Sequence, residues 1–249
     1  FPRHIPYSQC KVLVEKLEGL SNIYFRSRVK HIATLPKDKT DNKQIFLNIE
    51  LLDEAISHKR KVVFKYAEYG TDKKMHPKKR ANGTEREYVV SPYQMVAKEG
   101  KYYLICNYDP YRDISNYRLD HIQELRILDD PAKPFETLQG ANGQRLNLAE
   151  YMKEHLYMFS GKTVRIKFRI TKQMIGEVVE LFGKDITFSD EKEDGVTVTA
   201  HTNELSAEQF AKTYIPNVVV LEPQKLADKV RSSIGEILLK YQENAGEGI

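Results

Sequence analysis

The spacing of apolar residues changes along the chain, and the change predicts where helices and strands lie. After Asn48, the residues Ile49, Leu52 and Ala55 have the spacing of a short amphipathic helix. The period then falls to two. Strands are predicted at 62–66, 86–97, 101–108, 114–120 and 122–128. A helix followed by five short strands is what a small β-barrel requires.

A second pattern begins near residue 163. It predicts strands at 164–170, 185–189, 196–201 and 218–221, and helices at 172–182, from Ser206, and at 223–241. Ser206 and Gln209 fit a capping box at the start of the middle helix. The order βαββαβ with a trailing helix is the ferredoxin-like arrangement.

The whole chain is therefore predicted to be α+β, in four parts. These are an N-terminal helical linker or dimerisation segment (1–47), a five-stranded barrel (48–130), a connector with a helix at 148–158 (131–160), and a ferredoxin-like domain (161–249). In the first part, Ser8 can cap a helix and Leu35-Pro36 ends a second one.

Composition limits the class of protein. Of the 249 residues 41% are apolar and 30% are charged, as in a globular rather than a disordered chain. No apolar run approaches the roughly 20 residues of a membrane span and no signal peptide opens the chain, so we expect a cytoplasmic protein without a membrane partner. Cys10 and Cys106 have no metal-site spacing and are expected to be reduced. The net charge of +4 permits an anionic partner without requiring one.

Aromatic residues gather on the barrel segment, where nine of the fifteen tyrosines fall between residues 66 and 117. Alternation places Tyr102 and Tyr103 on opposite faces of their strand, so one fills the barrel and the other lines its surface. It also directs Arg118 away from the apolar side. A guanidinium beside phenol rings can hold a phosphate while a base stacks on a ring. A structural ion pair with an aspartate explains the same pattern equally well.

A basic hairpin is predicted between the first two strands of the barrel. Its candidate nucleic-acid contacts are Lys73, Lys74, Lys78, Lys79 and Arg80. Asn82-Gly83 supplies a turn, and Glu85 is the one acid of the segment. Such a tip can attract a polyanion, although charged loop tips are also commonly just solvated.

Three pieces of sequence occur in an order that resembles the WYL domain, an Sm-like barrel found mostly in bacterial transcriptional regulators. They are Tyr88–Val96 with its Ser-Pro-Tyr, Lys101–Ile105 with its Tyr-Tyr-Leu, and Tyr117–Ile122 with its Arg-Leu-Asp-His. Tyr102 stands where the family has its name-giving Trp. The second half resembles the C-terminal extension of these proteins at Leu181-Phe182-Gly183, Leu221-Glu222-Pro223 and Leu239-Lys240-Tyr241.

The resemblance implies a site and a function. The ligand residues it implies are Ser91, Tyr93, Tyr103, Arg118 and His121, with Tyr66 and Tyr102 as support. His121 replaces the commoner Arg and would make binding sensitive to pH. The implied function is the ligand-sensing and oligomerisation region of a homodimeric transcriptional regulator. Its effector would be a nucleotide or oligonucleotide, and a winged helix-turn-helix that is missing after Phe1 would bind operator DNA.

A stand-alone module that binds RNA or single-stranded DNA is the alternative. The sequence has no nucleotide-binding glycine loop, no nucleophile elbow and no zinc-protease motif, so no catalytic residue, metal or cofactor is expected. Asp113, Asp120 and Glu124 have no spacing that forces a metal site.

Overall fold

The computed structural model describes residues 44–141 and 143–246, and these divide into two compact units on either side of the Gly143–Gln144 bond. Each unit is described by itself. Both combine helices with an antiparallel sheet, which confirms the predicted α+β class. The helices predicted before residue 44, and Cys10, lie outside the described residues. None of the helices in the described ranges is long and apolar enough to cross a membrane.

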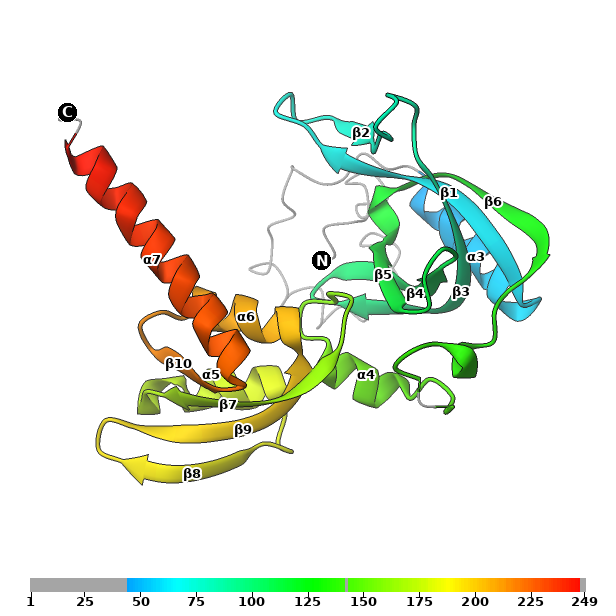
Figure 1. Ribbon diagram of the computed structural model, residues 1–249. Coiled ribbons are helices and arrows are strands. Elements are labelled where there is room, and N and C mark those ends of the chain that lie inside the picture. Colours follow the sequence, from blue (N-terminus) through cyan, green and yellow to red (C-terminus); the bar gives the residue numbers. More distant parts are fainter. Residues whose placement is uncertain (1–43, 142, 247–249) are drawn as a thin grey trace, which may run out of the picture. The chain divides into compact units, whose positions relative to one another are not determined.

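Within residues 44–141, the first unit contains one α-helix, short 3-10 turns and the strands of the barrel (Figure 1). Its elements are α3 (Ile45–Ser57), β1 (Arg60–Tyr69), β2 (Met75–Pro77), β3 (Glu87–Lys98), β4 (Lys101–Tyr108), β5 (Ile114–Arg118), η1 (Leu119–His121), β6 (Ile122–Pro131) and η2 (Phe135–Thr137). The five predicted strands are all present. The short strand β2 in the basic hairpin was not predicted, because three residues are too few to show alternation.

The strands form one curved sheet in the order β6-β1-β3-β4-β5, with β2 paired to the far end of β1. All pairs are antiparallel. The register of β3 on β4 shifts between Pro92 and Gln94, so Tyr93 is the additional residue of a bulge. A bulge bends its strand, and proline, which has no N–H to donate, is tolerated there.

The core of this unit lies between α3 and the inner face of the sheet. Leu52 and Ala55 of α3 are buried against Val62, Phe64 and their neighbours in the strands. The helix begins at Ile45, before the spacing that was predicted to follow Asn48. Asn48 lies inside the helix and is buried, and its Nδ2 donates to the Ile122 carbonyl at 3.0 Å. This bond ties α3 to the first residue of β6.

Over its described residues, 144–246, the second unit has four strands and four α-helices, with one more 3-10 turn. Its elements are α4 (Leu148–Glu154), β7 (Thr163–Ile170), η3 (Lys172–Met174), α5 (Ile175–Phe182), β8 (Thr187–Lys192), β9 (Gly195–Asn203), α6 (Glu204–Thr213), β10 (Val218–Glu222) and α7 (Gln224–Gly246). The sheet order is β10-β7-β9-β8. Numbered along the chain within this unit, the strands lie in the order 4-1-3-2. This is the strand order of a ferredoxin-like sheet, as predicted.

A single core joins this sheet to its helices. Phe168 of β7, Phe182 of α5 and Phe210 of α6 contact one another, with ring centroids 5.0–5.5 Å apart. The predicted capping box was wrong. Helix α6 begins at Glu204, and the Asn203 side chain caps it by accepting from the N–H groups of Leu205 and Ser206.

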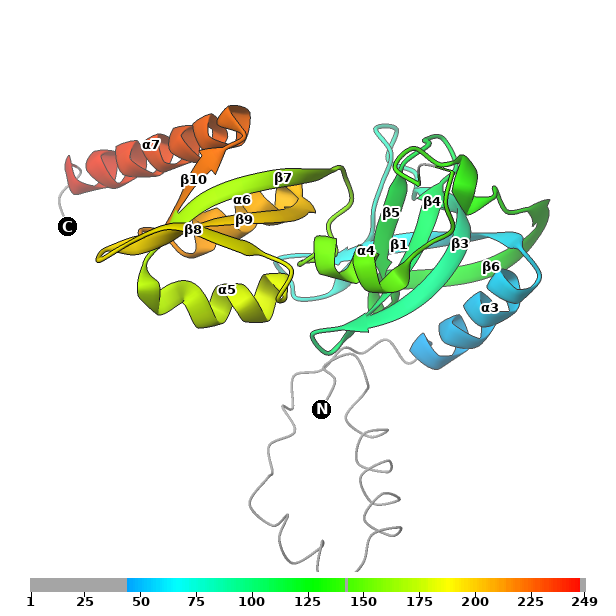
Figure 2. The same ribbon diagram turned by 90° about the horizontal axis from the view of Figure 1, so that it is seen from below.

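Helix α7 is buried only at its beginning. Leu226 and Val230 belong to the core of the second unit, where the helix packs on β10 and α6. Beyond them the helix continues past the sheet, as Figures 1 and 2 both show. The apolar residues of this later part are exposed, namely Ile234, Ile237, Leu238, Leu239 and Tyr241.

Candidate ligand site on the barrel

Arg118 ends strand β5 and is held by the aspartate that follows in η1. Its Nε lies 3.1 Å from Asp120 Oδ1 and its Nη2 lies 2.6 Å from Asp120 Oδ2. The Arg118 side chain keeps 33% of its exposure, whereas that of Asp120 keeps 6%. Burial opposes the charge on the guanidinium, but the hydrogen bonds to Asp120 outweigh it, so the pKa of Arg118 is raised. Arg118 is a fixed cation with one partly open side.

Tyr66 and His121 lie next to Arg118. The Tyr66 hydroxyl accepts from the Arg118 backbone N–H at 3.3 Å, and the Tyr66 and His121 rings stack with centroids 5.4 Å apart. Burial raises the pKa of Tyr66 to about 12, so it remains a neutral phenol. These contacts join β1 to β5 and to the turn η1.

The protonation of His121 follows from its contacts. His121 Nδ1 lies 2.8 Å from the Ala67 carbonyl, and a carbonyl only accepts, so Nδ1 carries the proton. Nε2 is then an acceptor, and it is buried without a hydrogen-bond partner in the described part of the chain. Burial, together with the charge of Arg118, lowers the pKa of His121. The ring is therefore neutral at neutral pH.

Tyr102 and Tyr103 face opposite ways, as their alternation predicts. Tyr102 packs against the core cluster of the barrel. Tyr103 is half-buried and pairs across β4 and β5 with Arg118, and burial raises its pKa. Tyr103 therefore lies opposite Arg118 on the neighbouring strand, while Tyr102 supports the strand from inside.

Ser91 and Tyr93 lie elsewhere on the barrel. Ser91 is fully buried, and its Oγ accepts from the Lys133 N–H at 3.0 Å. The Tyr93 hydroxyl donates to the Lys133 carbonyl at 2.9 Å, and its ring meets Phe135 edge-on. Both side chains thus fix the segment that follows β6. The structure does not bring them into the contacts that join Tyr66, Arg118 and His121.

The basic hairpin is partly neutralised. Lys78 Nζ lies 2.6 Å from Glu68, and Glu85 binds Lys65. The remaining hairpin candidates are exposed and have no acidic partner within the described residues; they are Lys73, Lys74, Lys79 and Arg80.

Arg86, at the base of the hairpin, is a candidate that the sequence did not single out. Its guanidinium lies 4.8 Å from the Tyr88 ring centroid and 5.4 Å from that of Tyr108, and its Nη2 donates to the Tyr108 hydroxyl at 3.1 Å. Alternation of Arg86 with Tyr88 signals a shared face. The contact with Tyr108, 22 residues later, needs the pairing of β3 with β4.

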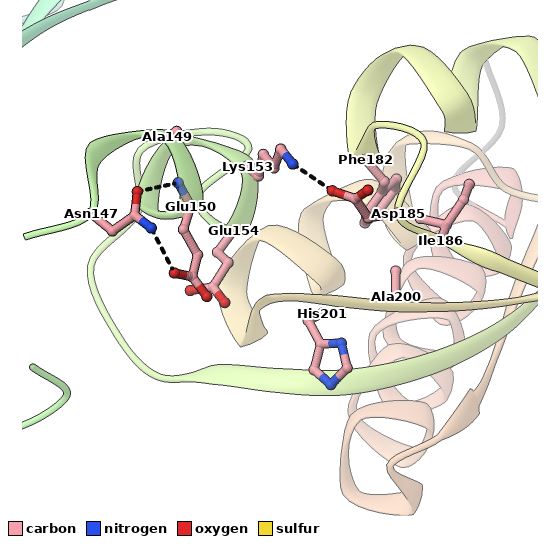
Figure 3. Close-up of a pocket in the computed structure, with 10 residues that line it drawn as sticks. All are labelled: Asn147, Ala149, Glu150, Lys153, Glu154, Phe182, Asp185, Ile186, Ala200 and His201. Carbon is pink, nitrogen blue, oxygen red and sulfur yellow. Dashed lines mark hydrogen bonds and ion pairs between the residues drawn. The ribbon is translucent and has the colours of Figure 1, made fainter. Parts of the chain in front are cut away.

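A cavity of about 590 Å³ lies in the second unit, and none of its lining residues is a predicted site residue (Figure 3). Its lining residues are Asn147, Ala149, Glu150, Lys153, Glu154, Phe182, Asp185, Ile186, Ala200 and His201. Lys153 forms an ion pair with Asp185 across the cavity, which joins α4 to the segment after α5. The pair neutralises the two charges, so this cavity has no directed charge for an anionic ligand.

These observations define the class: an Sm-like barrel with an aromatic and arginine site, joined to a ferredoxin-like domain. Family models identify the two parts. The WYL domain matches residues 48–127 and the WCX domain matches residues 162–238. The chain therefore contains a WYL domain followed by a WCX domain, in the order of the WYL barrel and C-terminal extension that the sequence predicts.

Two solved structures resemble the chain at low identity. Proteasome accessory factor B/C of Arthrobacter aurescens is 16% identical with a TM-score of 0.35. The match covers 80% of this chain and 28% of that protein. A CRISPR Cas-related protein is 15% identical with a TM-score of 0.47. The match covers 80% of this chain and 53% of that protein. This chain thus spans a part of each. A search of curated proteins found no match.

Proposed function

We propose that this chain is the ligand-sensing and oligomerisation region of a bacterial, cytoplasmic, DNA-binding transcriptional regulator. The barrel binds a nucleotide or a short nucleic acid as effector, and a winged helix-turn-helix outside this chain binds operator DNA. The effector acts by favouring one arrangement of a homodimer, because a ligand with equal affinity for both arrangements shifts nothing. The WYL and WCX domains support a regulatory rather than a catalytic role.

The observation that carries the proposal is the cluster around Arg118. It combines a partly open guanidinium with the rings of Tyr66, Tyr103 and His121. A cation suits a phosphate and flat rings suit a base, so the cluster matches the two chemical parts of a nucleotide. In this proposal Tyr102 supports the cluster from the core. Ser91 and Tyr93 contribute by fixing the segment at Lys133.

The homodimer of the proposal has a candidate surface on α7. Ile234, Ile237 and Leu238 are 41%, 51% and 57% exposed, and they follow the helical spacing of Leu226 and Val230. A second copy of α7 would remove this stripe from water. Burial of apolar side chains is the main driving force of such association.

Binding of labelled nucleic acids tests the proposal directly. We expect fluorescence anisotropy to show saturable binding of short single-stranded DNA or RNA, and unlabelled nucleotides to compete for it. Arg118→Ala should weaken binding at least tenfold while the far-UV circular dichroism stays unchanged. Arg126→Ala is the matched control, since Arg126 is an exposed arginine of the same unit that pairs with Glu87. No binding by the wild type at low or physiological salt would refute the proposal.

The exposed hairpin cations favour a second candidate, a stand-alone module that binds RNA or single-stranded DNA as its end function. Lys73, Lys74, Lys79 and Arg80 offer a charged edge without acidic partners in the described residues. The reading frame upstream of Phe1 distinguishes the two candidates. A winged-helix domain encoded there supports the regulator, and its absence from the full gene supports the module.

A further inference from the structure

Six aromatic rings form a continuous row through the barrel. The row is Tyr69, His121, Tyr66, Tyr88, Tyr108 and Tyr111, and successive centroids are 6.2, 5.4, 6.2, 5.3 and 5.6 Å apart. The middle of the row is covered, with Tyr88 only 5% exposed. The two end rings are open to solvent, Tyr69 at 55% and Tyr111 at 57%. The row of rings therefore links Tyr66 and His121, which lie next to Arg118, to the exposed ring of Tyr111. The proposed function does not use Tyr111.

Arg86 places a positive charge on the same row. It covers Tyr88 and contacts Tyr108, whose ring is next to Tyr111. Its interactions are with rings and a hydroxyl, and no carboxylate neutralises it among the described residues. Because the aromatic faces hold the guanidinium in position, little side-chain entropy remains to be lost when it binds an anion.

We propose that Arg86, Tyr108 and Tyr111 form a second subsite for the effector, in which Arg86 binds a backbone phosphate and Tyr111 stacks on a base. The inference rests on the proposed function and narrows it. An effector that reaches both Arg118 and Tyr111 must carry more than one base, so it is a single-stranded oligonucleotide rather than a mononucleotide. The exposed cations of the hairpin lie on the segment that leads to Arg86, so the charge of this side favours a polyanion.

Two variants test the subsite in the full chain, with labelled oligothymidylates of increasing length and thymidine monophosphate as probes. Tyr111→Ala should weaken oligonucleotide binding about tenfold, the loss typical of one stacked base, and leave the mononucleotide affinity unchanged. Binding weakens as salt rises, so the slope of log K against log salt is negative. Arg86→Met should make this slope less steep by about 0.7, the value for one phosphate contact on a single strand. Phe46→Ala, an exposed aromatic residue on α3, and Arg126→Met are the matched controls.

The outcomes separate this inference from the proposed function. If both variants bind every probe as the wild type does, while Arg118→Ala loses binding, the subsite is wrong and the effector site at Arg118 stands. If the wild type binds no nucleic acid, the subsite and the proposed function are both wrong. Since Tyr111 is exposed, its removal tests the subsite even if Arg86→Met lowers the melting temperature.

Discussion

Replacing Asp120 by asparagine tests whether Arg118 is fixed by its ion pair. The change keeps the shape of the side chain but removes the negative charge that faces the guanidinium at 2.6 Å and 3.1 Å. Asp120 is almost fully buried, whereas Arg118 keeps a third of its exposure. Water can therefore solvate the cation in part after its partner is lost.

The exposed fractions of the two side chains set the expected loss in the free energy of unfolding. Removing one partner of a fully buried pair costs about 3–5 kcal/mol, and an exposed pair contributes about 1 kcal/mol or less. We expect Asp120→Asn to lower the free energy of unfolding of the barrel by about 2 kcal/mol. For a unit of this size the melting temperature should fall by roughly 8–16 °C.

A double-mutant cycle with Arg118→Met provides the assay. Urea unfolding of the wild type, both single variants and the double variant gives the coupling energy, which we expect to be at least 1 kcal/mol. The double variant should be more stable than the sum of the single changes predicts, because it leaves no buried charge unpaired. A loss of less than about 0.5 kcal/mol in Asp120→Asn would refute the reasoning. Arg118 would then be held by the backbone of β5 and not by Asp120.

Three further predictions follow from other contacts. Asn48→Ala should lower the free energy of unfolding by about 2 kcal/mol in urea unfolding, because it removes the buried bond from α3 to Ile122, and an unchanged midpoint would contradict this role. The lowered pKa of His121 contributes stability that is present above about pH 6.5, the value in the unfolded chain, and is lost as the pH falls through the folded value. His121→Gln should therefore flatten the fall of the urea midpoint below that pH, and an equally steep fall would place its cause elsewhere. Leu238→Glu should convert the proposed dimer to a monomer in multi-angle light scattering, whereas a wild type that is monomeric at all concentrations would exclude the α7 interface.

Periodicity predicted a strand most clearly where the strand buries one face. In β7, for example, Ile166, Phe168 and Ile170 are buried and the residues between them are not. Helix starts were harder to predict. Asn203 and Ser206 are both good caps, and the choice between them depends on where β9 ends. The place of Asn48 inside α3 was equally hidden from the sequence, because its partner Ile122 lies 74 residues later.

The candidate site was predicted only in part. Alternation gave the direction of Arg118 and the opposite faces of Tyr102 and Tyr103, because these depend on local geometry alone. It did not decide between an aspartate and a ligand as the partner of Arg118, since both fit the same spacing. The position of Ser91 and Tyr93 depends on Lys133, about forty residues away, which sequence spacing does not reveal.

The charges of the barrel indicate where an anion is attracted and where it is positioned. Arg118 is neutralised by Asp120, Lys65 by Glu85 and Glu124, and Lys61 by Asp109. A neutralised cation can orient a phosphate, but it adds little long-range attraction. In the proposed function, the long-range attraction of the effector therefore comes from cations such as Arg86 and the exposed lysines of the hairpin. Salt should therefore weaken oligonucleotide binding mainly through the hairpin and Arg86, whereas Arg118 should control which ligand is bound.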